Sequence, residues 1–351
     1  MNFVDMQETL TDLIKLYRTR GLSLRNHVNP LIKDAGLVTQ ASWNNTLAHI
    51  QQYDESEITR DQFGKTIEGF RKDLFNRILY DNKFISIVDN VSNYDEIKVS
   101  LEQLSCEKFD KQTASDLINL EEDSTCYKST VGSATAYIFK EIRKYSVKEE
   151  LNINSLKLEY QNDGYDKLVA FVDILLPCFD SIIMDDERQR IILAADLSSI
   201  FYVDHLRAAL AYLRTIIRKK TAEEIKVSDK NVNFFPAIQK LYEEDIGDVK
   251  ELAFKTDDGV AHYENAKRGI PSIKDGDFHI AGSDVADIEA YRIRKTYSSN
   301  TPNQENSVYL ASSWYVLNGI KTDRKLGEAT ISASSHKEFF DIIDKLLNWS
   351  E

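Results

Sequence analysis

The segment VKELAFKTDDGVAHYE, residues 249–264, decides the fold class. Apolar and polar residues alternate on both sides of the pair Asp258-Gly259. Such alternation is typical of β-strands, whose side chains point in turn to the core and to solvent. An Asp-Gly pair favours a tight turn between antiparallel strands, because glycine readily adopts the positive φ that this turn requires. The segment therefore predicts a β-hairpin.

The sequence that follows extends this pattern into a sheet. Four more segments read as strands: DFHIA (277–281), VADIEAYRIRKTY (285–297), SVYLASSWYVL (307–317) and GEATIS (327–332). The chain then closes with SSHKEFFDIIDKLLNW (334–349), in which Ser335 and Glu338 form a capping box before an apolar helical stripe. Strands followed by one amphipathic helix predict an antiparallel sheet with the helix on one face.

The first two-thirds of the chain is expected to be mainly helical. Apolar residues recur at helical spacing in 6–17 and 59–79, and shorter helices are expected within 95–119 and 131–145. The apolar run 166–183 reads as a buried helix broken at Pro177, and a long helix is expected over 188–220. We place a boundary at residue 225, so that a helical domain (1–225) precedes an α+β domain (226–351), and the fold class is α+β.

Composition limits the class of protein. The chain has 351 residues, 42% of them hydrophobic, and a net charge of -13. It can therefore build large cores, and its acidity argues against a general nucleic-acid-coating protein. The three cysteines are widely spaced and do not have the spacing of zinc ligands. The N-terminus lacks the pattern of a signal peptide. No apolar run is long enough to span a membrane. We expect a soluble cytoplasmic protein with reduced thiols.

Two histidines near the hairpin form the first candidate site. His262 and Glu264 share one face of the second hairpin strand, and His279 lies in the next strand-like segment. If these strands pair, imidazole and carboxylate groups meet, and they are able to transfer protons or bind a divalent metal. The alternative is that each histidine is a solvent-facing strand residue near a turn, and we favour this second interpretation.

Four acidic residues form the second candidate site. Asp180, Asp185, Asp186 and Glu187 lie between two apolar runs. Grouped carboxylates are suitable ligands for Mg²⁺ or Mn²⁺. Acidic residues also gather at helix N-termini because the helix dipole favours negative charge there, and this interpretation is the simpler one.

Basic residues form the third candidate, a local surface for nucleic acid or an acidic partner. Arg292 and Arg294 share one face of a predicted strand, with tyrosines nearby. Arg214, Arg218, Lys219 and Lys220 gather at the end of the predicted long helix. A solvated strand face and a helix C-terminus that favours cations explain the two groups without any ligand.

The sequence contains no phosphate-binding loop, dinucleotide-binding glycine pattern, nucleophile elbow or zinc-protease motif. We therefore expect an intracellular interaction or regulatory protein that binds a protein partner or forms a homo-oligomer, with no cofactor. The alternative is a Mg²⁺- or Mn²⁺-dependent enzyme acting on nucleic acid or nucleotides, in the setting of a microbial antiviral defence system. Nucleic acid is expected to bind only through a local basic patch, and no membrane association is expected.

Overall fold

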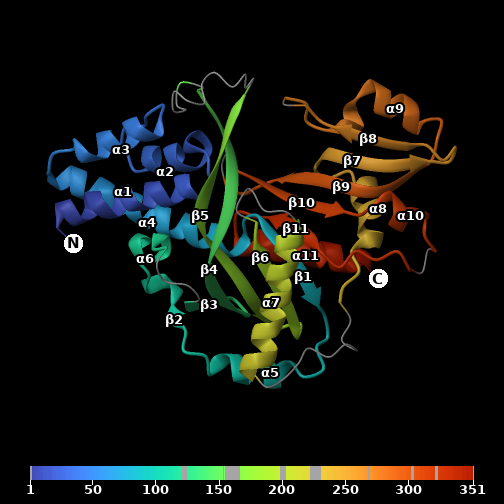
Figure 1. Cartoon of the computed structure of the whole chain (residues 1–351), viewed down its shortest axis with the longest axis horizontal. Coiled ribbons are helices and arrows are strands. Elements are labelled where there is room, and N and C mark those ends of the chain that lie inside the picture. The colour runs from blue at the N-terminus through green and yellow to red at the C-terminus, as the bar shows by residue number, and fades with distance from the viewer. Residues whose placement is uncertain are drawn as a thin grey trace.

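The computed structural model describes residues 2–120, 125–152, 154, 167–197, 203–221, 231–267, 269–301, 304–320 and 323–350. One sheet of eleven strands runs through the molecule in the order β2-β3-β4-β5-β6-β1-β11-β10-β9-β7-β8 (Figure 1). All neighbouring strands are antiparallel except β2 and β3, which are parallel. The strands are β1 (Lys83–Val88), β2 (Glu107–Lys108), β3 (Cys126–Val131), β4 (Ala134–Leu151), β5 (Leu168–Asp185), β6 (Arg190–Asp196), β7 (Asp248–Thr256), β8 (Ala261–Asn265), β9 (Ile288–Ser298), β10 (Glu305–Ala311) and β11 (Ala329–Ser332).

Helices cover both faces of this sheet and fill the N-terminal part, which confirms the α+β class. The α-helices are α1 (Phe3–Thr19), α2 (Asn29–Asp34), α3 (Trp43–Gln51), α4 (Glu57–Tyr80), α5 (Tyr94–Glu102), α6 (Ala114–Ile118), α7 (Val203–Thr221), α8 (Phe235–Glu243), α9 (Asp277–Ser283), α10 (Trp314–Asn318) and α11 (His336–Ser350). Shorter turns of helix are the π-helix η1 (Leu24–Val28) and the 3₁₀-helices η2 (Phe109–Lys111) and η5 (Ile273–Asp275).

Strand β1 lies in the middle of the sheet, with strands β2–β6 on one side of it and strands β7–β11 on the other. Its sequence KFISIV is buried throughout, and it pairs with β6 on one side and with β11 on the other. Ile85 and Ile87 belong to the core that contains α1, α4, α8 and α11, whereas Phe84 and Val88 belong to the core under α5 and α7. Because both faces of this strand pack against a core, four of its six residues (Phe84, Ile85, Ile87 and Val88) are large and apolar, while Lys83 and Ser86 are buried polar residues.

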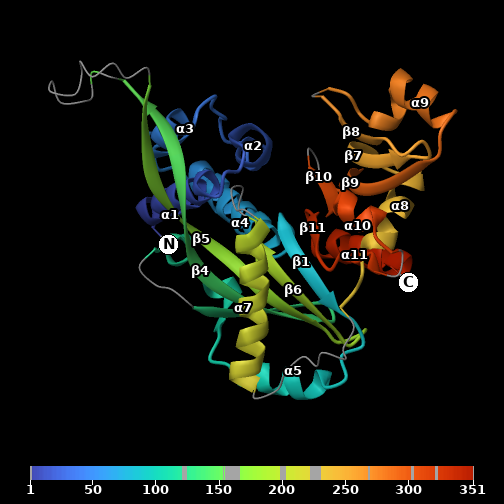
Figure 2. The same ribbon diagram turned by 45° about the vertical axis from the view of Figure 1, so that its right-hand side comes forward.

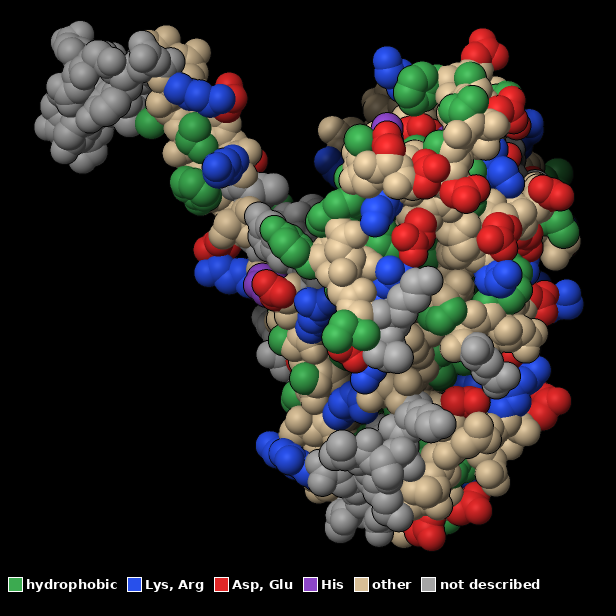
Figure 3. Space-filling view, turned by 90° about the vertical axis from the view of Figure 1, so that its right-hand side faces the viewer, with side chains coloured by type: hydrophobic (Ala, Val, Ile, Leu, Met, Phe, Trp, Pro, Cys, Tyr) green, Lys and Arg blue, Asp and Glu red, His purple; other side chains and the backbone are tan. Residues whose placement is uncertain are grey.

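Strands β4 and β5 continue beyond the sheet as a two-stranded ribbon. They pair over eighteen residues each, whereas β3 reaches only Phe139 of β4 and β6 reaches only Ser181 of β5. Figures 2 and 3 show the ribbon standing away from the rest of the molecule. Phe171 and Leu175 of this ribbon are exposed.

Several sequence-based assignments within the chain are corrected by the structure. Residues 134–145 lie in β4 and residues 168–183 lie in β5, so neither segment forms the expected helix, and 188–220 contains β6 before α7. DFHIA forms α9 and is not a strand. The hairpin at Asp258-Gly259 is confirmed by β7 and β8, with Gly259 at φ 87°. The boundary at residue 225 lies outside the described residues.

Two further observations concern the cysteines and the membrane. Cys106 and Cys126 form a disulfide, and Cys178 is a buried free thiol, so the expectation of three thiols is wrong for the first two. Among the described helices, none combines the length and the apolar character needed to cross a bilayer.

Candidate functional site

A polar cleft of about 840 Å³ lies where the central strands begin or end. One wall comes from strand termini, with Asp196 ending β6, Ser298 ending β9, Glu305 starting β10 and Ser332 ending β11. The other wall comes from the end of α1, from η1 and from the last turn of α4. The cleft therefore brings together segments from both ends of the chain.

Neutral polar side chains make up much of the lining. Five carry hydroxyl groups and three carry amides: Ser298, Ser299, Thr301, Ser332, Ser334, Asn26, Asn82 and Gln304. Hydroxyl and amide groups both donate and accept hydrogen bonds. The cleft is consequently suited to a ligand with many hydrogen-bonding groups.

The sequence DLFNRILYD (73–81) at the end of α4 builds the centre of the site. Asp73, Arg77 and Asp81 are spaced by four residues, which places them on one face of the helix. Arg77 Nε donates to Asp73 Oδ2 at 2.6 Å, and Arg77 Nη1 donates to Asp81 Oδ2 at 2.8 Å. Burial opposes the charge of Arg77, but the two carboxylates outweigh it and raise the pKa of the guanidinium.

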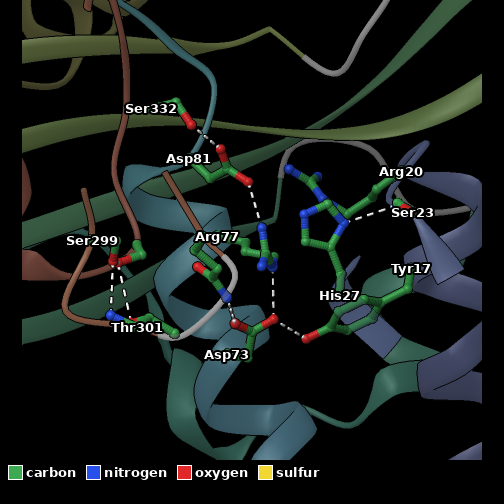
Figure 4. A network of polar contacts seen from close by, with 12 residues as sticks. Tyr17, Arg20, Ser23, His27, Asp73, Arg77, Asp81, Ser299, Thr301 and Ser332 are labelled. Atoms are coloured by element: carbon green, nitrogen blue, oxygen red, sulfur yellow. Dashed lines mark hydrogen bonds and ion pairs between the residues drawn. The ribbon is translucent and has the colours of Figure 1, made fainter. Parts of the chain in front are cut away.

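One nitrogen of Arg77 is buried and has no hydrogen-bond partner within the described residues. This nitrogen is Nη2, and the side chain is 7% exposed. Buried donors in native proteins nearly always have a partner, so an unpaired one is unusual. Figure 4 shows the guanidinium groups of Arg77 and Arg20 next to the imidazole of His27.

Asp73 holds α1 against α4 at the base of the site. Tyr17 Oη donates to Asp73 Oδ2 at 2.6 Å (Figure 4). Gln304 Nε2 donates to Asp73 Oδ1 at 3.3 Å. Burial and the neighbouring carboxylate raise the pKa of Tyr17 well above its ordinary value. Tyr17 therefore stays a phenol and a hydrogen-bond donor at neutral pH.

Arg20 and Asp196 form a buried ion pair at the back of the cleft. Two nitrogens of Arg20 reach the two oxygens of Asp196 at 2.9 and 3.2 Å, and Lys83 Nζ lies 3.8 Å from the same carboxylate. Burial alone would raise the pKa of Asp196, but Arg20 and Lys83 lower it strongly. The backbone N–H of Phe179 also donates to Asp196 Oδ2, at 2.9 Å.

His27 contributes a neutral imidazole. Its Nδ1 accepts from the backbone N–H of Ser23 at 2.8 Å, so in the neutral ring the proton is on Nε2. Burial lowers the pKa of His27, and Arg77 lowers it further, while Asp81 and Asp73 act in the opposite direction with smaller effect. His27 is thus a neutral N–H donor at pH 7.

A carboxylate behind the cleft fixes the loop after β9. Glu338 accepts from Ser299 Oγ at 3.1 Å, from the backbone N–H of Asn300 at 2.8 Å and from Ser335 Oγ at 2.9 Å. Ser334 Oγ also donates to Glu338. Burial opposes ionisation, but these hydrogen bonds lower the pKa of Glu338 to about 2. The charged form of Glu338 therefore stabilises this wall.

The charges that line the cleft nearly cancel. Arg20 and Arg77 are balanced by Asp81 and Asp196, which leaves the exposed carboxylate of Glu305. Four lining side chains, namely Asn26, Asn82, Ser298 and Glu305, form no side-chain hydrogen bond or ion pair within the described residues. These groups are available to a ligand without breaking an internal contact.

The structure brings together part of the predicted histidine site. His279 Nδ1 lies 2.8 Å from Glu264 Oε2, and His279 Nε2 lies 3.1 Å from Tyr242 Oη. His262 stacks on Phe254 with ring centroids 4.9 Å apart, and its Nε2 lies 3.5 Å from Thr256 Oγ1. His279 is buried in α9, so the interpretation of it as a solvent-facing strand residue is wrong. Both its nitrogens have protein partners, and it connects α9, β8 and α8.

The structure separates the four predicted acidic ligands. Asp180 is paired with Arg143, and Asp185 lies 3.7 to 3.8 Å from Arg188 and Arg190. Asp186 accepts from Tyr94 and Lys98, whereas Glu187 lies 3.5 Å from Arg188. Over the described ranges, no group of three or more His, Cys, Asp or Glu side chains is placed to hold a metal ion.

Three of the predicted basic residues, Arg214, Arg292 and Arg294, have local partners. Arg292 and Arg294 lie 3.9 and 3.4 Å from Glu251, and Arg294 stacks on Tyr309. On α7, Arg214 donates to Asn231, and Arg218 and Lys219 are exposed. The side chain of Lys220 lies outside the described part.

The sequence interpretation missed the residues of the cleft. Arg20, His27 and Arg77 are far from Ser298 in sequence, and no short motif joins them. The spacing Asp73–Arg77–Asp81 was the one local signal, and it is common on helix surfaces. Comparison of the chain with protein-family models, with curated proteins and with solved structures gave no match, so its function has to be inferred from the geometry of the cleft.

Proposed function

We propose that the protein is a non-catalytic regulatory protein that binds a small, uncharged, hydroxyl-rich ligand, such as a sugar or a nucleoside, in the polar cleft. The observation that carries this proposal is the combination of nearly balanced charge with free amide and hydroxyl side chains in the lining. A volume of about 840 Å³ falls within the usual range for small-molecule sites.

The chemistry of the lining favours hydroxyl groups over phosphate. A hydroxyl group donates to a carboxylate such as Glu305 and accepts from an amide such as Asn26 or Asn82. A phosphate adds negative charge beside Asp81, Asp196 and Glu305, and the cations that would compensate it are already paired. An uncharged ligand avoids this repulsion.

The position of the cleft supports a regulatory role. A ligand there touches η1 and α4 on one wall and the ends of β9 and β11 on the other. Binding energy can shift an equilibrium between arrangements of two walls when the ligand contacts both in only one arrangement. In such a protein, ligand binding changes the affinity for a protein partner or for a second copy of the chain. Light scattering with and without ligand measures whether the molecular mass of the protein in solution changes.

Isothermal titration calorimetry with glucose, ribose and adenosine, and with ribose 5-phosphate as the charged counterpart, tests the proposal. We expect at least one uncharged compound to bind with a Kd below about 1 mM. The double variant Asn26→Ala/Ser298→Ala should weaken that binding at least about tenfold, because each substitution removes a free hydrogen-bonding group. The matched control Asn45→Ala/Ser133→Ala changes the same residue types at exposed positions outside the cleft and should leave the Kd unchanged.

Three results contradict the proposal. They are absence of binding across the panel, tighter binding of ribose 5-phosphate than of ribose, and equal binding by the cleft variant and wild type. Turnover of a nucleotide or nucleic acid in the presence of Mg²⁺ or Mn²⁺ would show instead that the protein is an enzyme.

A further inference from the structure

A second cavity, of about 810 Å³, lies along residues 68–75 of α4, in the turns that precede Arg77. Its walls come from α1, α4, the segment from Cys106 through α6, and β3. Figure 1 shows α6 directly below α1 and α4. None of its lining residues lines the polar cleft, so it is a separate site.

The floor of this cavity is apolar. Leu13, Leu74, Phe109 and Leu117 line it and are each 5% exposed or less. The ring of Phe75 lies 5.5 Å from that of Phe109 between centroids. An apolar floor of this kind gains free energy by excluding water when a hydrocarbon group covers it.

The rim of the cavity is positively charged. Arg71, Lys72, Lys108 and Lys128 line it, against one carboxylate, Glu68. Over the residues that the structure places, none of these four cations forms an ion pair. Lys128 Nζ lies over the ring of Tyr137, 5.6 Å from its centroid. Unpaired cations are available to an anion without loss of an internal salt bridge.

This concentration of positive charge is unusual for the chain. Its net charge is -13, yet the residues lining the cavity carry a formal charge of three positive units, since four cations oppose Glu68. The polar cleft has the reverse character, with charges that nearly cancel and few apolar side chains. The two sites therefore select different ligands.

We infer that this cavity binds an amphipathic anion, namely a hydrocarbon chain that ends in a carboxylate or a phosphate. The chain covers Leu13, Leu74 and Phe109, and the head group lies among Arg71, Lys72 and Lys108. This inference goes beyond the proposed function, because it assigns a second ligand of another chemical class to residues that the polar cleft does not use.

The disulfide supports one wall of the cavity. Cys106 lines the cavity and is joined to Cys126 of β3. Lys108 and Phe109 follow within three residues, in a segment whose strand β2 is only two residues long. The covalent link thus fixes a segment that few hydrogen bonds hold.

Calorimetric titration of the full chain tests the inference with four probes of matched structure. Sodium laurate and dodecyl phosphate carry both the chain and the charge, 1-dodecanol carries only the chain, and acetate carries only the charge. We expect saturable one-to-one binding of laurate or dodecyl phosphate with a Kd below about 100 µM. Dodecanol and acetate should each bind at least about tenfold more weakly. The tighter of the two anions identifies the head group.

Variants place the binding in this cavity. Arg71→Glu/Lys72→Glu reverses two exposed rim charges and should weaken binding of the anion at least about tenfold. The control Arg60→Glu/Lys65→Glu makes the same charge change at exposed positions of the same helix and should alter the Kd less than about threefold.

A third variant tests the apolar floor. Phe75→Ala should weaken laurate binding while acetate binding stays as it was, and circular dichroism checks that each variant is folded. The inference is overturned if dodecanol binds as tightly as laurate, if neither anion binds, or if the rim variant and its control have the same effect.

Discussion

The carboxylate of Glu338 offers a quantitative test of how the wall of the polar cleft is held. It accepts hydrogen bonds from Ser299, Ser334, Ser335 and the backbone of Asn300, and its pKa is lowered from 4.5 to about 2. That difference corresponds to about 3 kcal/mol of interaction that the charged form makes only in the folded state. Glu338→Gln keeps the shape and removes the charge, so we expect a loss of about 2–3 kcal/mol at pH 7.

The sign of the pH dependence follows from the direction of this shift. A lowered folded-state pKa gives stability that is complete above the ordinary value of 4.5 and is lost as the pH falls from there toward 2. The difference in the free energy of unfolding between wild type and Glu338→Gln should therefore be constant from pH 7 to about pH 5. By about pH 3.5 it should be smaller by about 1.4 kcal/mol, because wild type alone loses this contribution.

Urea unfolding followed by tryptophan fluorescence and circular dichroism measures both quantities. Glu305→Gln is the matched control, because Glu305 also lines the cleft but is exposed and has no partner within the described chain, so its effect should stay within about 0.5 kcal/mol. A loss below about 0.5 kcal/mol for Glu338→Gln, or a difference that does not change between pH 7 and 3.5, would refute the reasoning.

Three further predictions concern other parts of the structure. Arg20→Met leaves Asp196 buried, with Lys83 3.8 Å away as its remaining cation, and should lower the free energy of unfolding by about 3–5 kcal/mol. A loss below about 1 kcal/mol in urea unfolding would contradict the buried pair. Thiol titration of the unreduced chain in concentrated guanidinium chloride should detect one thiol, Cys178, and three after reduction; three before reduction would exclude the disulfide. Gly259→Ala should cost about 1 kcal/mol, because its φ is 87° and nothing lies within 4 Å of the added Cβ. Gly247→Ala should cost at least about 2 kcal/mol, because its Cβ would lie 2.5 Å from Thr296 O, and equal thermal shifts for the two alanine variants would contradict this difference.

Local sequence patterns predicted the elements whose stability is local. The turn at Asp258-Gly259 and the capped helix α11 depend on residues close in sequence, and both form where they were expected. The run 166–183 was assigned to a helix because a continuous apolar segment fits a buried helix and a buried strand equally well. Its strand state comes from pairing with β4 and β6, which the run itself does not encode.

The candidate site could not be predicted for the same reason. Arg20 meets Asp196 across 176 residues, and Gln304 meets Asp73 across 231 residues. Contacts at such separations are determined by the order of strands in the sheet, which places β1 between β6 and β11. The histidine site was partly anticipated, because Glu264 and His279 do meet, although α9 and not a strand carries the histidine.

A crystal structure of the protein grown with the uncharged compound that binds most tightly tests the central claim most directly. The proposal predicts electron density for the compound in the polar cleft, with its hydroxyl groups within hydrogen-bond distance of Asn26, Asn82 and Ser298. Density for the compound elsewhere on the molecule, with the side chains of the cleft unchanged, would contradict it.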